Sequence, residues 1–331
     1  MSTAPALAET VAAPAPRRRG RLLLPILLFG LLALAPLAVS LGMPSGWLAL
    51  LTRAMIFAIA ALSLDLILGV GGLVSFGHAA FLGIGAYVTG IMITEGQAEA
   101  LLILPVVLGI CALFAAITGA ICLRTRGVTF IMITLAFGQM VYFLAQALSA
   151  YGGDDGLTLY EKSTIAGLDL FSTRTGFFYC VLAALAGCYV LVRILVASRF
   201  GRILRAAREN PVRVSVTGFD VTRIRLVAYV ISGMVAGIAG FFLANHTDFV
   251  SPAFMSWQRS GELIFMAVLG GVGSLHGAII GAIAYLIAED GLSHLTEHWR
   301  VIFGPLIILF VLFTRGGIVG MLRKLGGGGG A

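Results

Sequence analysis

The chain has 331 residues, of which 59% are hydrophobic and only 11% are charged. Soluble domains carry about 25% charged residues, so this composition excludes a chain that folds around one water-soluble core. Several apolar runs approach the roughly 20 residues that span a bilayer. We therefore predict an all-α, polytopic helical membrane protein. Its four cysteines all lie inside apolar runs, without metal-ligand spacing, and are expected to be small buried hydrophobes.

The N-terminal segment, residues 1–21, is rich in Ala and Pro and ends in RRRGR. We predict a disordered, basic, cytoplasmic tail. The apolar run 22–41 follows. It is longer than the hydrophobic part of a signal peptide, and Pro36 follows its only small-residue cleavage pattern, so we interpret it as a first transmembrane helix.

Eight further apolar runs follow: 50–69, 78–94, 101–123, 128–149, 176–197, 224–244, 262–288 and 301–314. Glycines interrupt the run 262–288. If it forms two helices joined at 270–274, the chain has about ten crossings, a transmembrane domain over 22–315 and a flexible cytoplasmic tail over 316–331. The sequence leaves open whether 262–288 makes two crossings or a re-entrant hairpin.

The distribution of positive charge supports ten crossings. Of the 22 Lys and Arg residues, five would lie outside and the other 17 in the cytoplasm, as the positive-inside rule requires. Both termini are then cytoplasmic. The net charge of +7 and the pI of about 9.6 are therefore a sign of topology, not of nucleic-acid binding. The five external residues are Arg53, Lys162, Arg174, Arg259 and Arg300.

One long basic segment, residues 199–225 (RFGRILRAARENPVRVSVTGFDVTRIR), separates two apolar runs. Pro211 disfavours helical geometry at Asn210, which ends a first short helix. A second short helix closes at Gly218, and Asp220 or Thr222 can cap the transmembrane helix that follows. Two short helices on the membrane surface can present this segment to a soluble partner. The alternative is an interfacial anchor on anionic lipid.

Two glycine-rich segments predict broken helices. In 69–90, a break at 71–77 would leave backbone groups that only protein or a water-filled path can satisfy. In the segment 269–285 a His, a Gly and a Tyr recur with the same spacing as in 69–90. Paired broken helices of this kind indicate a transport path. A packing role is the alternative reading of His78. The candidate path residues are Ser75, Gly77, His78, Gly271, Gly273 and His276.

Two external segments, 151–175 and 245–259, are candidate docking surfaces, with Asn245, His246 and Asp248 as docking or gate residues; ordinary external loops are the alternative. No GxxxxGK[ST] phosphate loop or HExxH motif occurs. Intramembrane carboxylates are limited to Asp65 and Glu262, which argues against a proton- or sodium-coupled carrier. We expect a non-enzymatic chain that holds no cofactor.

Three motifs resemble one family. LSLDLILGVGGLVSFGHAAFLGIGAYVTG, FGRILRAARENPVRVSVTGFDVTRIRLVAYVISGMVAGIAG and LIFMAVLGGVGSLHGAIIGA occur in order between residues 60 and 290. They are similar to the permease subunits of branched-chain amino acid ABC importers, in particular the M-type, the longer of two paralogous permeases. Asp65 departs from the pattern, because the family often has Asn there.

The resemblance implies a helical ABC importer permease of about ten helices in the bacterial inner membrane. Such a subunit pairs with a shorter permease and with two cytoplasmic ATPases, which bind ATP and Mg²⁺. A periplasmic amino-acid-binding protein delivers the substrate. The residues expected to contact an ATPase are Arg202, Arg205, Arg208, Glu209, Asn210 and Gly218. Alternatives are a related permease for urea, short amides or aromatic acids, a carrier that needs no ATPase, and an assembly protein.

Overall fold

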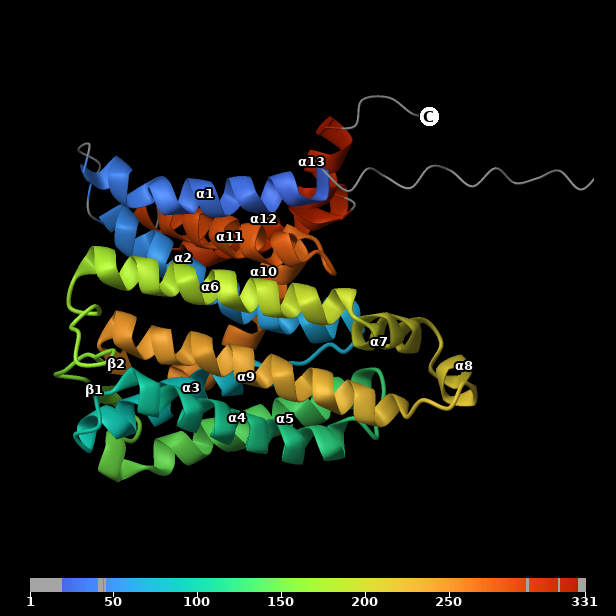
Figure 1. Ribbon diagram of the computed structural model, residues 1–331, viewed down its shortest axis with the longest axis horizontal. Helices are drawn as coiled ribbons and strands as arrows, with labels where there is room; N and C mark the ends of the chain where they lie inside the picture. Colours follow the sequence, from blue (N-terminus) through green and yellow to red (C-terminus); the bar gives the residue numbers. More distant parts are fainter. Residues whose placement is uncertain (1–19, 41–43, 45, 296–297, 315, 327–331) are drawn as a thin grey trace, which may run out of the picture.

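The computed structural model describes residues 20–40, 44, 46–295, 298–314 and 316–326 (Figure 1). Within these residues the chain forms thirteen α-helices and one two-stranded ribbon, which confirms the all-α prediction. Six helices are long and apolar enough to cross a membrane, and three shorter ones are also apolar. Residues 1–19 of the predicted N-terminal tail lie outside the described part of the chain.

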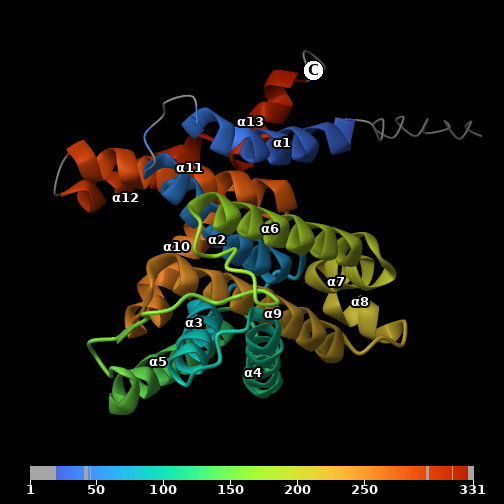
Figure 2. The same ribbon diagram turned by 60° about the vertical axis from the view of Figure 1, so that its left-hand side comes forward.

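The helices lie side by side and run between two ends of the bundle (Figures 1 and 2). The long ones are α1 (Gly20–Ser40), α2 (Gly46–Asp65), α4 (Ala100–Cys122), α5 (Val128–Ala147), α6 (Arg174–Ala197), α9 (Val221–Thr247) and α11 (Leu275–Leu295). The shorter ones are α3 (Ala79–Thr94), α7 (Arg199–Glu209), α8 (Pro211–Val216), α10 (Trp257–Gly270), α12 (Trp299–Phe313) and α13 (Gly317–Gly326).

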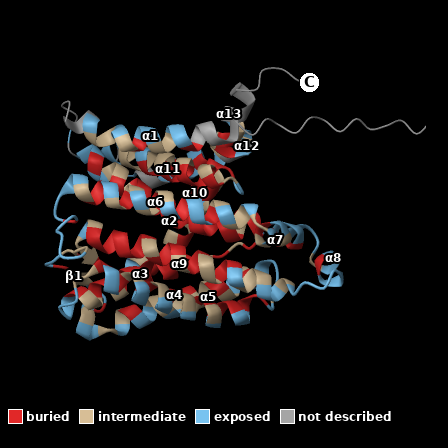
Figure 3. Ribbon diagram, in the orientation of Figure 1, coloured by how far each residue is buried: buried red, intermediate tan, exposed pale blue. Residues whose placement is uncertain are grey.

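Helices α2 and α9 form the centre of the bundle. Helix α2 packs against α6, α9, α10 and α11, and α9 packs against α3 and α4. Both central helices are mostly buried, whereas less than a third of α4, α5 and α6 is buried (Figure 3). A membrane protein has no need to bury these outer faces, because lipid covers them.

Glycines bring α3 and α9 into backbone contact. A Cβ atom on Gly85 would collide with the carbonyl oxygen of Gly237, and one on Gly240 would collide with that of Leu82. Such close approach is the usual source of stability between helices in a membrane, where no hydrophobic force drives association. The short, glycine-rich α3 is thus held along its length by the central helix.

The first predicted break is confirmed. Helix α2 continues into a π-helical turn, η1 (Leu66–Val70), and residues 71–78 then return without regular structure to the start of α3. The crossing formed by 71–94 is therefore irregular in one half and helical in the other.

The second predicted break, at 270–274, is confirmed as the turn between α10 and α11, and a further irregular part that the sequence does not predict as a break precedes α10. After α9 the chain passes through β2 (Phe249–Val250) and the 3₁₀ turn η3 (Pro252–Met255) before α10 begins. Val250 lies against Gly90 and Met255 against Gly83, so this irregular part runs antiparallel to α3. Helix α10 then continues to the turn 271–274, and α11 runs back. Residues 249–270 thus extend through the depth of the bundle.

A β-ribbon joins the two external segments. Strand β1 (Leu157–Thr158) pairs antiparallel with β2, with Leu157 opposite Val250. Close by, Asn245 accepts a hydrogen bond from the backbone N–H of Ser163 at 2.8 Å. We call this end of the bundle the ribbon end, and the end that carries α7 and α8 the elbow end (Figure 1).

Residues 317–326 differ from the expected flexible tail, because they form α13. The physical reason is packing: Val319 is buried, and α13 contacts both α10 and α11. Gly317 lies against Gly270 and Gly271, where a side chain would not fit. Only residues 327–331 of that tail lie outside the described part of the chain at this terminus.

Replacing Gly240 by Ala should destabilise the protein, since the new Cβ would overlap backbone atoms of α3. Overpacking of this kind costs about 1–3 kcal/mol. Gly187→Ala is the matched control, because nothing lies within 4 Å of the Cβ it would add on the outer face of α6. Thermal unfolding in detergent should show a lower midpoint for Gly240→Ala alone. Equal midpoints for the two variants would contradict the close contact.

Candidate functional site

The elbow, residues 199–225, forms as the sequence predicts. Helix α7 ends at Glu209, and the Asn210 side chain accepts the N–H of Arg213 at 3.0 Å, which caps α8. The turn that follows α8 ends at Gly218, whose φ of +88° favours glycine. Asp220 then accepts the N–H groups of Thr222 and Arg223, at 3.0 and 3.1 Å, and so begins α9.

The inner face of the elbow is fastened to the bundle. Leu204 and Ala207 are fully buried. Arg205 donates to the carbonyl oxygen of Val196 at 2.7 Å, and Arg225 donates to that of Ala207 at 2.9 Å. These bonds satisfy helix-end carbonyls that would otherwise lack partners. Helix α7 is therefore a rigid extension of α6 and α9, not a loose loop.

The outer face of the elbow combines apolar and basic residues. Val216 is 82% exposed and Val212 is 64% exposed on α8, which projects furthest from the bundle (Figure 1). Phe219 is exposed beside them, and the arginines Arg202 and Arg213 are exposed as well. Apolar residues with a basic rim are typical of a protein-binding surface.

Arg208 connects the elbow to both predicted breaks. Its guanidinium donates to the carbonyl oxygen of Gly69 in η1, and its stem packs on Gly72. Gly69 in turn lies against Gly273 of the turn 271–274. Asp65 bridges the same place, since its Oδ1 accepts the N–H of Gly273 at 2.7 Å. Residues from α2, η1, α7 and the α10–α11 turn thus meet at one point, which we call the junction.

Arg208 and Asp65 both contact Gly69 at the junction, Arg208 through the carbonyl oxygen of Gly69 and Asp65 beside its Cα. Gly273 has a φ of +82°, and a Cβ on Gly69 would overlap both Asp65 and Gly273. Glycine is therefore required at both positions, one for the turn and one for the close approach.

Deeper in the bundle, four polar side chains from four elements form a buried cluster. Ser63 donates to the carbonyl oxygen of Ala60 at 2.6 Å, and its single hydroxyl proton is thereby used. Its oxygen therefore accepts from Nε2–H of His78, at 2.8 Å. Ser232 donates to the carbonyl oxygen of Ser63 at 2.5 Å, and the hydroxyl of Ser260 accepts the N–H of Ala79 at 3.0 Å. The cluster joins α2, α3, α9 and α10 where both broken crossings begin their helices.

The candidate path residues fall into two groups. Ser75, Gly77 and His78 are fully buried, and Gly77 packs against the backbone of Thr134 in α5. Gly271, Gly273 and His276 line an open cavity of about 590 Å³ at the elbow end, together with Arg193 and Arg205. The structure therefore brings the second group, but not the first, next to the elbow.

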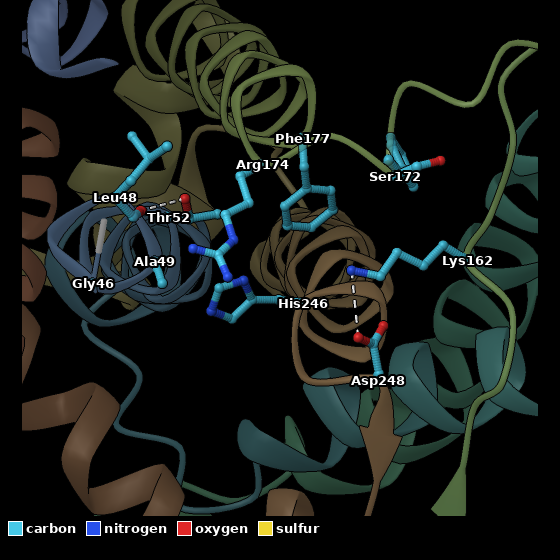
Figure 4. Close-up of a pocket in the computed structure, with 11 residues that line it drawn as sticks. Gly46, Leu48, Ala49, Thr52, Lys162, Ser172, Arg174, Phe177, His246 and Asp248 are labelled. Atoms are coloured by element: carbon cyan, nitrogen blue, oxygen red, sulfur yellow. Dashed lines mark hydrogen bonds and ion pairs between the residues drawn. The ribbon is translucent and has the colours of Figure 1, made fainter. Parts of the chain in front are cut away.

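The candidate docking residues lie in two different environments. Asn245 is buried and binds backbone groups only, donating to Phe241 O at 3.0 Å. His246 and Asp248 line a second cavity, of about 510 Å³, at the ribbon end. Figure 4 shows Arg174 and Lys162 extending into this cavity from opposite sides.

Several residues of these sites do not stand out in the sequence. The approach of Gly69 to Gly273 joins segments about two hundred positions apart. Lys162 and Arg174 appear in the sequence only as cations in an external loop. Charge alone could have suggested that Lys162 pairs with Asp248, since both lie in the predicted external segments.

Comparison with known proteins places the chain in a family. Residues 46–312 match the family described as "Branched-chain amino acid transport system / permease component". The chain is 29% identical to the high-affinity branched-chain amino acid transport system permease protein LivM of Escherichia coli (strain K12), over 88% of this chain and 75% of that protein. The LivM protein of Salmonella typhimurium is also 29% identical, with coverages of 82% and 69%.

A shorter paralogue is similar as well. The permease protein LivH of Escherichia coli (strain K12) is 24% identical over 80% of this chain and 91% of its own length. No solved structure matches the chain. Because the family match extends over most of the sequence, the chain belongs to the family of permease components of branched-chain amino acid transport systems.

Proposed function

We propose that this chain forms one half of the membrane channel of an ATP-driven importer of branched-chain amino acids. The observation that carries the proposal is the elbow, which projects from the bundle with an apolar, basic outer face and is bonded on its inner face to the junction. Such an element can receive a push from a soluble subunit and transmit it to the two broken crossings.

The partners follow from this role. A shorter, paralogous permease completes the channel, two cytoplasmic ATPase subunits hold ATP and Mg²⁺, and a periplasmic binding protein delivers the amino acid. The chain itself performs no catalysis. It lies in the bacterial inner membrane with both termini in the cytoplasm, which places the elbow beside the ATPases and the ribbon end toward the binding protein. The positive charge around the elbow supports this orientation.

The mechanism uses the contacts of the junction. When the ATPases close, α7 and α8 shift as one body, and Arg208 carries the shift to Gly69 in η1. Asp65 passes it to Gly273, and thus to the turn between α10 and α11. Alternating access requires that ATP stabilise one arrangement of these segments over the other.

Uptake assays test the substrate. The complete complex in liposomes should take up labelled leucine, isoleucine and valine only when ATP is inside and the binding protein is outside. Uptake of urea or of an aromatic acid in place of these amino acids would contradict the proposed substrate. Leucine uptake driven by an ion gradient without ATP would contradict the importer itself.

The elbow is tested by Val216→Asp. An aspartate buried at the contact with an ATPase would lack a partner, so association of the ATPase should weaken on the order of tenfold or more. Val128→Asp is the control, because Val128 is a 67% exposed valine at the start of α5. Copurification of the ATPase measures association. Retention of the ATPase by Val216→Asp would remove the elbow from the interface.

The junction is tested by Arg208→Gln. This variant keeps the outer face of the elbow but removes the bond to Gly69, so the ATPase should still bind while amino-acid uptake per ATP falls severalfold. Arg124→Gln removes a charge from an exposed arginine after α4 and serves as the control. Unchanged uptake per ATP in Arg208→Gln would show that the force reaches the crossings by another route.

A further inference from the structure

The cavity at the ribbon end has the size of a small-molecule site. Its volume of about 510 Å³ lies within the roughly 300–1,000 Å³ of such sites. The walls come from the start of α2, the start of α6, the end of α9 and the loop before α6. These elements meet at the ribbon end, remote from the elbow (Figure 1), and Figure 4 shows the cavity in close-up.

The cavity contains charges of both signs. Lys162 Nζ lies 3.3 Å from Asp248 Oδ2, and both side chains remain more than a third exposed. Arg174, the first residue of α6, also lines the cavity, and within the described part of the chain no acidic group pairs with it. One guanidinium is therefore available to an incoming carboxylate, while Asp248 can attract an incoming ammonium group.

Apolar side chains line the same cavity. Phe177 is buried and stacks on His246 with the ring planes at 10° and the centroids 5.9 Å apart. Leu48 of α2 and Phe171 are buried beside them. Sites for small molecules combine such a wall with a few convergent polar groups.

We propose that this cavity is a binding site for an apolar α-amino acid in its zwitterionic form. Arg174 binds the α-carboxylate through paired N–H groups, Asp248 binds the α-ammonium, and Phe177 and Leu48 contact the side chain. A carboxylate without an ammonium group would lack the contact with Asp248, and an amine without a carboxylate would lack the contact with Arg174. The site rests on the proposed function, and it identifies where this subunit itself meets the substrate.

The test is equilibrium binding of labelled leucine to the intact membrane complex, without the binding protein, in nanodiscs of phosphatidylglycerol. Leucinamide lacks the carboxylate and 4-methylvalerate lacks the ammonium group. Each should compete at least about tenfold more weakly than leucine. Equal competition by the three compounds would overturn the proposal, as would the absence of leucine binding.

Three variants at two positions assign the site to this chain. Arg174→Gln should weaken leucine binding at least about tenfold, and Arg174→Lys should restore part of it. Asp248→Asn should weaken leucine but not 4-methylvalerate, since 4-methylvalerate has no ammonium group to contact Asp248. Asn also tolerates the positive φ of 52° at this position. Arg124→Gln is the matched control, because Arg124 is an exposed arginine that does not line this cavity.

Unfolding midpoints of all four variants check that the fold is kept. Leucine binding that is unchanged in Arg174→Gln overturns the proposed site. If nanodiscs with phosphatidylethanolamine abolish leucine binding, the cavity is a lipid headgroup site and the proposal is likewise overturned. Failure of the proposed function is separate: it would appear as absence of ATP-driven leucine uptake by the unaltered complex with its binding protein.

Discussion

Hydrogen bonding of backbone groups within the membrane determines this structure. Two crossings lose helical structure for part of their length, and the bilayer offers no water to satisfy the groups set free. The buried cluster of Ser63, His78, Ser232 and Ser260 supplies part of what is missing, since Ser260 caps the start of α3 and His78 is held on Ser63. Breaks that are satisfied in this way can persist and still change geometry.

The elbow also depends on side chains that satisfy main-chain polar groups. Arg205, Arg208 and Arg225 all donate to main-chain carbonyls near helix ends. Three of the basic residues that give the segment its charge thus bind main-chain groups within the chain, and Arg202 and Arg213 are exposed. Basic charge that orients a segment in a membrane can at the same time fix its shape.

The features that depend on local sequence patterns can be predicted from the sequence. Apolar runs predict the helices, Asn210-Pro211 and Gly218 predict the two parts of the elbow, and the glycines predict both breaks. The junction could not be predicted, because it depends on the approach of Gly69 to Gly273 and on the direction of Arg208. The ribbon of β1 and β2 has only two residues a strand, too few for any periodicity. Helix α13 was missed because its stability comes from contacts with α10 and α11, not from its glycine-rich sequence.

The β-ribbon has a consequence for how the outer surface behaves. Leu157 of one external segment and Val250 of the other both pack against Gly90 of α3. Lys162 and Asp248 add an ionic link between the same two segments. The two segments are therefore joined to each other and to α3 as one unit, so a displacement of either segment at the ribbon end would act on the same helix.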